Sequence, residues 1–257
     1  MKTSANGQNP TGQSGGVLYQ VSLLQGLAYG DYNGCVTVKE LRQHGNTGIG
    51  TFHRLNGELI LLDGEVYRAA GDGSVEVVSA DETTPFAVAA FLQAHETTTL
   101  AGLCDYDALL RELDSIVEVR GKNRFYMIRL DGMFRQMHVR SVPAQTEPYG
   151  RLVDVLAQQQ TEFVYDTVDG TLVGLYCPPY MNQLNAVGWH MHVLSKDKTK
   201  GGHVLGVSVG EAKLTVCEID SFQLQLPQTA AFDRFDLTVD QSHDIEKIER
   251  NQSTTSF

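Results

Sequence analysis

The sequence has few cysteines, and none of the four belongs to a C-x-x-C pair. Thiolate zinc sites and the disulfide frameworks of small secreted domains both need clustered cysteines, so this spacing argues against both. We therefore expect four buried free thiols, at Cys35, Cys104, Cys177 and Cys217.

Long apolar runs are also missing, since no uninterrupted stretch reaches the roughly 18 residues of a membrane-spanning helix. Residues 1–16 are rich in Gly, Ser, Asn and Gln and contain no apolar run typical of a signal peptide. The sequence therefore predicts a flexible tail over residues 1–16 and a cytoplasmic protein that binds no membrane.

Basic residues are scarce, because 20 Lys and Arg stand against 31 Asp and Glu and give a formal net charge of −11. An acidic chain without a Lys/Arg-rich block repels the phosphate backbone, so we expect no binding to nucleic acid. An anionic small-molecule substrate fits this charge only where a metal ion or a buried arginine supplies local positive charge.

Strand-like segments dominate both halves of the 257-residue chain. Helical spacing predicts helices over 83–95, 105–119 and 149–160, and an Asp-Gly pair at 131–132 predicts a hairpin. We predict an α+β fold with two strand-rich subdomains, mixed β-sheets and a few helices. The domains are expected at 17–160 and 161–257.

The two halves also share a hairpin layout. Residues 48–64 and residues 188–206 each contain two strand-like segments around a turn. An internal duplication is one interpretation of this likeness.

Three histidines have the spacing of metal ligands. In the strand-like stretch GWHMHVL, alternation puts His190 and His192 on the same face. The loop SKDKTKGG returns the chain and places His203 opposite His192, with Cβ atoms about 4.5–5.5 Å apart. Three imidazoles with one open side are typical of catalytic zinc, although Fe, Ni, Cu and Co also accept imidazole.

Other polar candidates stand outside this hairpin. Glu65 follows an Asp-Gly turn and, from its sequence context alone, is an ordinary surface glutamate, as are Glu246 and Glu249 in DIEKIER. Arg140 lies among apolar residues, where a buried guanidinium needs an anionic partner such as a substrate carboxylate or Glu65.

Several long stretches together resemble the α-acetolactate decarboxylase family, over nearly the whole chain after the tail. These are LLQGLAYGDYNGCVTVKELRQHGNTGIGTFHRLNGELILLDGEVYRA, HVRSVPAQTEPY, GWHMHVLSKDKTKGGHVL and a glutamate near the carboxyl end. The resemblance implies a two-domain α+β protein that forms a homodimer and decarboxylates 2-acetolactate to acetoin and CO2.

The resemblance also implies roles for the candidate residues. It assigns a catalytic Zn²⁺ to the three histidines, cavity-lining positions to Glu65 and Arg140, and a C-terminal site carboxylate to Glu249, with Glu246 as its competitor. In that scheme zinc acts as a Lewis acid that stabilises an enediolate, and Arg140 orients the carboxylate. Glu65 or Glu249 delivers the proton.

Two alternatives remain open from the sequence. The first is another three-histidine metalloenzyme that acts on a different small carbonyl compound. The second is a metal-stabilised binding module, whose metal would be coordinatively closed and whose fold would be lost with the metal.

Overall fold

The computed structural model describes residues 16–93 and 96–249, without the side chains of Glu96 and Glu249. The predicted tail over residues 1–16 lies outside the described residues except for Gly16. Short 3-10 turns occupy His53–Leu55, Pro179–Met181 and Phe232–Arg234. The helices and strands are, in chain order, β1 (Gly16–Val21), α1 (Leu24–Ala28), β2 (Val36–Thr37), α2 (Val38–Leu41), β3 (Thr47–Thr51), β4 (Glu58–Leu62), β5 (Glu65–Ala69), β6 (Val75–Val77), β7 (Thr83–Thr84), β8 (Ala87–Ala90), β9 (Glu96–Leu103), α3 (Tyr106–Arg120), β10 (Phe125–Ser141), α4 (Leu152–Gln159), β11 (Thr161–Cys177), β12 (Gly188–Ser195), β13 (Gly201–Gln225) and α5 (Ser242–Glu249).

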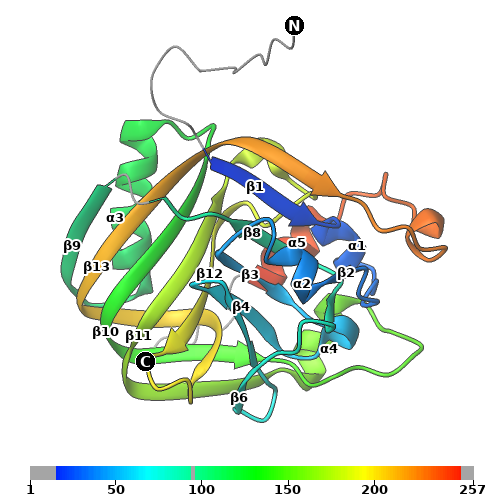
Figure 1. Cartoon of the computed structure of the whole chain (residues 1–257), viewed down its shortest axis with the longest axis horizontal. Coiled ribbons are helices and arrows are strands. Elements are labelled where there is room, and N and C mark those ends of the chain that lie inside the picture. Colours follow the sequence, from blue (N-terminus) through cyan, green and yellow to red (C-terminus); the bar gives the residue numbers. More distant parts are fainter. Residues whose placement is uncertain (1–15, 94–95, 250–257) are drawn as a thin grey trace, which may run out of the picture.

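A mixed sheet of eleven strands is the main structural element of the protein (Figure 1). Strands β10, β11, β12 and β13 pair in that order, and β10 also pairs with β13, so these four strands close a ring. From β13 the sheet continues through β1, β8, β3, β4 and β5 to β6. The pair β1–β13 is parallel and β10–β11 is antiparallel, so the predicted α+β class with mixed pairing is confirmed.

The predicted domain boundary near residue 160 falls between α4 and β11. The sheet runs across this point, because β10 pairs with β11 from Tyr126 to Ser141. Both hairpins behind the suggested duplication are present, as β3–β4 and β12–β13. The duplication itself stays a prediction.

The helix predicted over 83–95 is wrong. Strand β8 occupies part of this range and lies between β1 and β3, with all four of its residues buried. On β3, a Cβ at Gly48 would lie 2.1 Å from the carbonyl oxygen of Val88. The close approach of these backbones favours sheet pairing over the local helical spacing.

The hairpin predicted at the Asp131-Gly132 pair is also wrong, because β10 passes straight through it as a 17-residue strand. The Asp131 carboxylate accepts hydrogen bonds from Arg129 Nε at 2.7 Å and from Thr171 Oγ1 at 2.7 Å. These hydrogen bonds hold Asp131 and Gly132 in an extended conformation, although the Asp-Gly dipeptide is common in turns.

The predicted helices near residues 105–119 and 149–160 are confirmed as α3 and α4. The Asp105 side chain caps α3 by accepting a hydrogen bond from the amide of Ala108 at 2.7 Å. No helix in the described part of the chain is long and apolar enough to cross a membrane.

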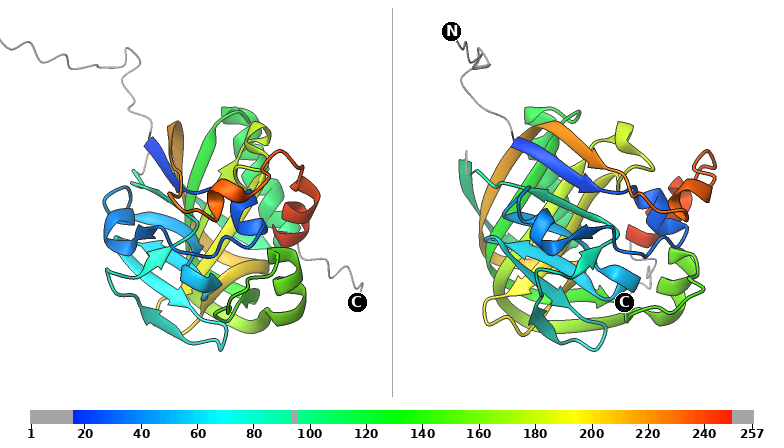
Figure 2. Two further views of the ribbon diagram at one scale, coloured as in Figure 1. Left: turned by 90° about the vertical axis from the view of Figure 1, so that its right-hand side faces the viewer. Right: turned by 45° about the vertical axis from the view of Figure 1, so that its right-hand side comes forward.

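Helices α1, α4 and α5 gather on one side of the protein, where α5 lies beside α4 (Figure 2). Their apolar side chains form one buried cluster. It includes Leu24 and Leu27 from α1, Leu152 and Leu156 from α4, and Ile245 and Ile248 from α5.

The close approach of β3 and β8 makes a stability prediction. Gly48→Ala places a Cβ against a backbone oxygen, so we expect the free energy of unfolding to fall by about 1–3 kcal/mol in urea denaturation. Gly150→Ala is the control, because the nearest atom to its added Cβ is 3.5 Å away. Equal denaturation midpoints for Gly48→Ala and the unmodified protein would contradict this account of β8.

Candidate metal centre and active site

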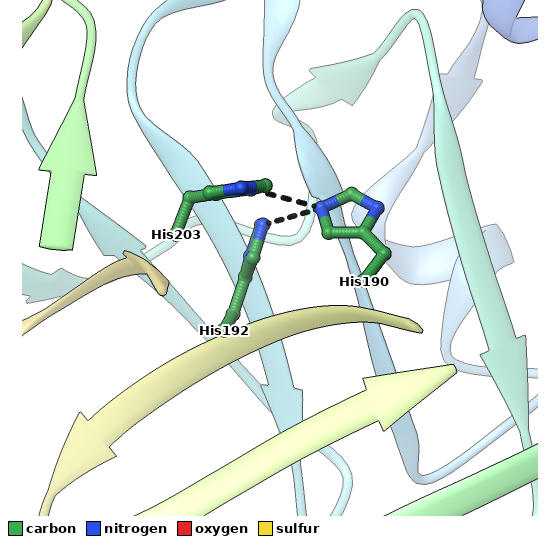
Figure 3. A group of neighbouring side chains, drawn as sticks. All are labelled: His190, His192 and His203. Atoms are coloured by element: carbon green, nitrogen blue, oxygen red, sulfur yellow. Dashed lines mark hydrogen bonds between the residues drawn. The ribbon is translucent and has the colours of Figure 1, made fainter. Parts of the chain in front are cut away.

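Three histidines converge at the start of the β12–β13 hairpin (Figure 3). His190 Nε2 lies 3.1 Å from His192 Nε2 and 3.1 Å from His203 Nδ1. His192 and His203 are direct partners in the β12–β13 ladder, so the predicted cross-strand placement is confirmed. All three side chains are buried.

The loop of this hairpin fixes the register that brings the histidines together. Ser195 Oγ accepts hydrogen bonds from the amides of Thr199 at 3.1 Å and Lys200 at 2.9 Å. Gly202 follows with φ of +149°, and a Cβ there would lie 2.8 Å from the carbonyl oxygen of Arg140. A larger residue would separate β13 from β10 just beside His203.

Burial favours the neutral form of His190 and of His192. Burial, reinforced by the charge of Arg140, lowers the pKa of His190 to about 3. Burial is also the main cause that lowers the pKa of His192. His192 Nδ1–H donates to the carbonyl oxygen of Leu59 at 2.9 Å, which leaves the lone pair of Nε2 directed at the other imidazoles.

This arrangement fits a divalent metal ion. Ligand nitrogens about 2.0–2.1 Å from a tetrahedral zinc ion lie about 3.3 Å from one another, close to the 3.1 Å separations around His190 Nε2. Lone pairs that face each other at this distance repel unless a proton or a cation lies between them. The three imidazoles leave at least one coordination position open for another ligand.

Arg140 enters the site from β10, where it pairs directly with His203 on β13. Its side chain is buried, and its Nε has no hydrogen-bond partner among the described residues. A buried guanidinium N–H without a partner is costly, so the site is suited to an anion that accepts this hydrogen bond.

Glu58 is the carboxylate that the structure brings to the histidines, and the sequence analysis missed it. Its Oε2 lies 3.5 Å from His192 Nε2, and its side chain is 12% exposed. Glu58 lines a small cavity together with Thr51, Arg140, His190 and others. No local signal distinguished Glu58, because Glu65 also opens a strand after a turn ending in glycine and glutamate is seldom buried unless it is paired.

The structure does not bring Glu65 to the site, which corrects the expected cavity position. Glu65 pairs with Leu62 at the far end of the β4–β5 hairpin, four residues along β4 from Glu58, or about 14 Å. Its side chain is 44% exposed, and its Oε1 lies 3.5 Å from Arg42 Nη1. The surface position that its sequence context indicated is the one observed.

The C-terminal candidates are only partly described. Glu249 is the last residue of α5, and its side chain lies outside the described residues. Glu246 is exposed and lines a different hollow, next to Trp189 and Ser242. Ile248 of the same helix lines the histidine cavity.

A cavity lined by two imidazoles, a guanidinium and a carboxylate, with the third imidazole beside that carboxylate, has the groups of an enzyme pocket for a small molecule. The model of the alpha-acetolactate decarboxylase family matches residues 18–239. The alpha-acetolactate decarboxylase of Brevibacillus brevis is 39% identical over 222 residues, which cover 86% of this chain and 77% of that protein.

Another relative and a solved structure agree with this match. The alpha-acetolactate decarboxylase of Methanosarcina mazei is 38% identical over 238 residues, 91% of this chain and 80% of that protein. The crystal structure of alpha-acetolactate decarboxylase from Bacillus subtilis superposes with a TM-score of 0.88 at 33% identity and covers 91% of this chain and 100% of that one. The chain belongs to the α-acetolactate decarboxylase family and is therefore a carboxy-lyase.

Removal of one imidazole tests whether the histidines bind a metal. We expect His192→Ala, purified with zinc present, to lose the ion that the unmodified protein retains, at about one per chain, because two imidazoles bind zinc far more weakly. Elemental analysis of the folded proteins measures this. His138→Ala is the matched control. His138 lies on β10, outside the group of three histidines, and hydrogen-bonds Glu162 at 2.7 Å. Full zinc content in His192→Ala would contradict the assignment.

Proposed function

We propose that this enzyme decarboxylates 2-acetolactate to acetoin and CO2, with zinc held by His190, His192 and His203. The observation that carries the proposal is the convergence of these three buried imidazoles beside buried Arg140. Membership of the family supports the choice of substrate, because the relatives are named for it.

The metal and Arg140 have complementary tasks in this reaction. Zinc bound by three imidazoles supplies Lewis-acid stabilisation of negative charge that develops on a substrate oxygen. Arg140 binds the substrate carboxylate through its guanidinium, including the buried Nε–H, and orients the bond that breaks. A local cation of this kind reconciles an anionic substrate with a chain of net charge −11.

Protonation needs an acid inside the cavity. Departure of CO2 leaves an electron pair that must accept one proton to give acetoin, and a carboxylic acid held on one side of the substrate supplies it stereospecifically. Glu58 takes this role in our proposal, in place of Glu65, because its carboxylate lies within the cavity beside His192. Glu249 at the end of α5 is the proposed second carboxylate.

The helical side of the cavity is apolar. Its lining there includes Leu24 and Leu27 of α1, Leu152 of α4 and Ile248 of α5. A dry cavity strengthens the electrostatic contacts of Arg140 and keeps competing proton donors away. The homodimer and the cytoplasmic location expected from the sequence stay predictions.

Two glutamine variants test the assignment of the acid. We expect Glu58→Gln to bind zinc normally but to form acetoin about 10²–10⁴-fold more slowly, because the amide cannot transfer the proton. Glu65→Gln should retain activity within about two-fold, as expected for a surface position. The assay measures acetoin released from 2-acetolactate, with spontaneous decay subtracted. Full activity of Glu58→Gln would remove Glu58 from the chemistry.

A further inference from the structure

The described residues leave a volume of only about 40 Å³ in the histidine cavity, too little for a solute of substrate size. His192 is 0% exposed, His203 3% and Arg140 6%. A substrate that contacts these groups therefore enters only when part of the wall moves. One side of the wall consists of sheet strands held by backbone hydrogen bonds, and the other consists of α1, α4 and α5.

Helix α5 is joined to the sheet by an irregular segment. It packs mainly against α1 and α4, where Ile245 and Ile248 join the apolar cluster. The chain before it, from Leu226 to Gln241, contains a 3-10 turn and no strand. This segment is fixed at Val239, whose carbonyl oxygen accepts a hydrogen bond from Gln25 Nε2 at 2.7 Å. Rotation about residues 240–241 would move α5 without moving the sheet.

The surroundings leave room for such a movement. A hollow of about 880 Å³ adjoins α5 and is lined by Ser242, Ile245 and Glu246 from the helix and by Gly188 and Trp189 from β12, among others. The hollow also borders α3, and Trp189 donates to Asp114 of that helix at 2.9 Å from the face of β12 opposite to His190. Ile248 of α5 lines the histidine cavity, so a displacement of α5 into the hollow would move Ile248 relative to His190.

A polar contact joins α5 to α4. Arg151, the N-cap residue of α4, donates from Nη2 to the carboxylate of Asp244 in the first turn of α5. The same nitrogen donates to Gln241 Oε1 at 3.3 Å. Arg151 therefore ties the start of α5, and the residue just before it, to α4.

We propose that α5 is the movable cover of the histidine cavity, and that Arg151 is a positioning residue that holds this cover closed over bound substrate. The proposal rests on the proposed function only for its kinetic readout, because movement of α5 is measurable without turnover. The role differs from catalysis, since Arg151 acts through α5 and does not line the cavity.

The test compares zinc-loaded Arg151→Ala with Arg124→Ala. Arg124 also forms an ion pair near the surface, with Glu218, but at the start of β10. Loss of an exposed pair worth up to about 1 kcal/mol corresponds to about five-fold in the closing equilibrium. We expect amide hydrogen exchange in residues 242–249 and the rate of zinc extraction by a chelator to rise about five-fold in Arg151→Ala alone.

The kinetic constants separate positioning from general loss of structure. A less populated closed state weakens apparent substrate binding, so KM should rise about five-fold while kcat stays within about two-fold. In Arg151→Lys the rise in KM should be smaller than in Arg151→Ala, because lysine retains a positive charge for Asp244.

Identical exchange, zinc extraction and KM in Arg151→Ala and Arg124→Ala would overturn the proposal. Faster amide exchange and zinc extraction in a protein that makes no acetoin would instead contradict the proposed function. The proposal that α5 is a movable cover would then still stand.

Discussion

The burial of three imidazoles within a few ångströms of one another is the constraint on which the site depends. His192 Nε2 and His203 Nδ1 both approach His190 Nε2, and burial disfavours protonation of His190 and His192. Such a group is stable only with a shared proton or a shared cation, and its neutral nitrogens are good metal ligands. Three features act on this group of histidines: the register of β12 and β13 brings His192 opposite His203, the carbonyl of Leu59 orients His192, and the guanidinium of Arg140 lies beside them.

The division between sheet and helices explains how the site can be both precise and accessible. The strands carry His190, His192, His203, Arg140 and Glu58, and β10, β11, β12 and β13 hold one another in a closed ring. Helices α1, α4 and α5 contribute apolar side chains that exclude water. Ligands and charges are thus held by hydrogen-bonded strands, whereas the cover belongs to a short helix near the end of the chain.

The sequence predicted the parts of the site that follow from local alternation. Strand period and a glycine-containing loop were enough to place His192 opposite His203, and the apolar context of Arg140 was enough to predict its burial. The choice between Glu58 and Glu65 failed because each follows a turn ending in glycine, and only sheet register separates the two ends of the β4–β5 hairpin.

Prediction of the fold from the sequence has the same limit. Strand β8 was predicted to be a helix because its spacing is compatible with both elements. The close approach of the β3 backbone at Gly48, which decides in favour of a strand, depends on residues about forty positions away. Long-range pairing of this kind cannot be obtained from the periodicity of one segment.

The most direct measurement of the account is the release of acetoin and CO2 from racemic 2-acetolactate by the purified protein. It is made before chelation, after chelation and after zinc is added back, with spontaneous decay subtracted. We predict that activity is lost with the metal and returns with zinc. A folded, zinc-loaded protein that releases neither product, or one whose activity survives complete removal of metal, would contradict the account.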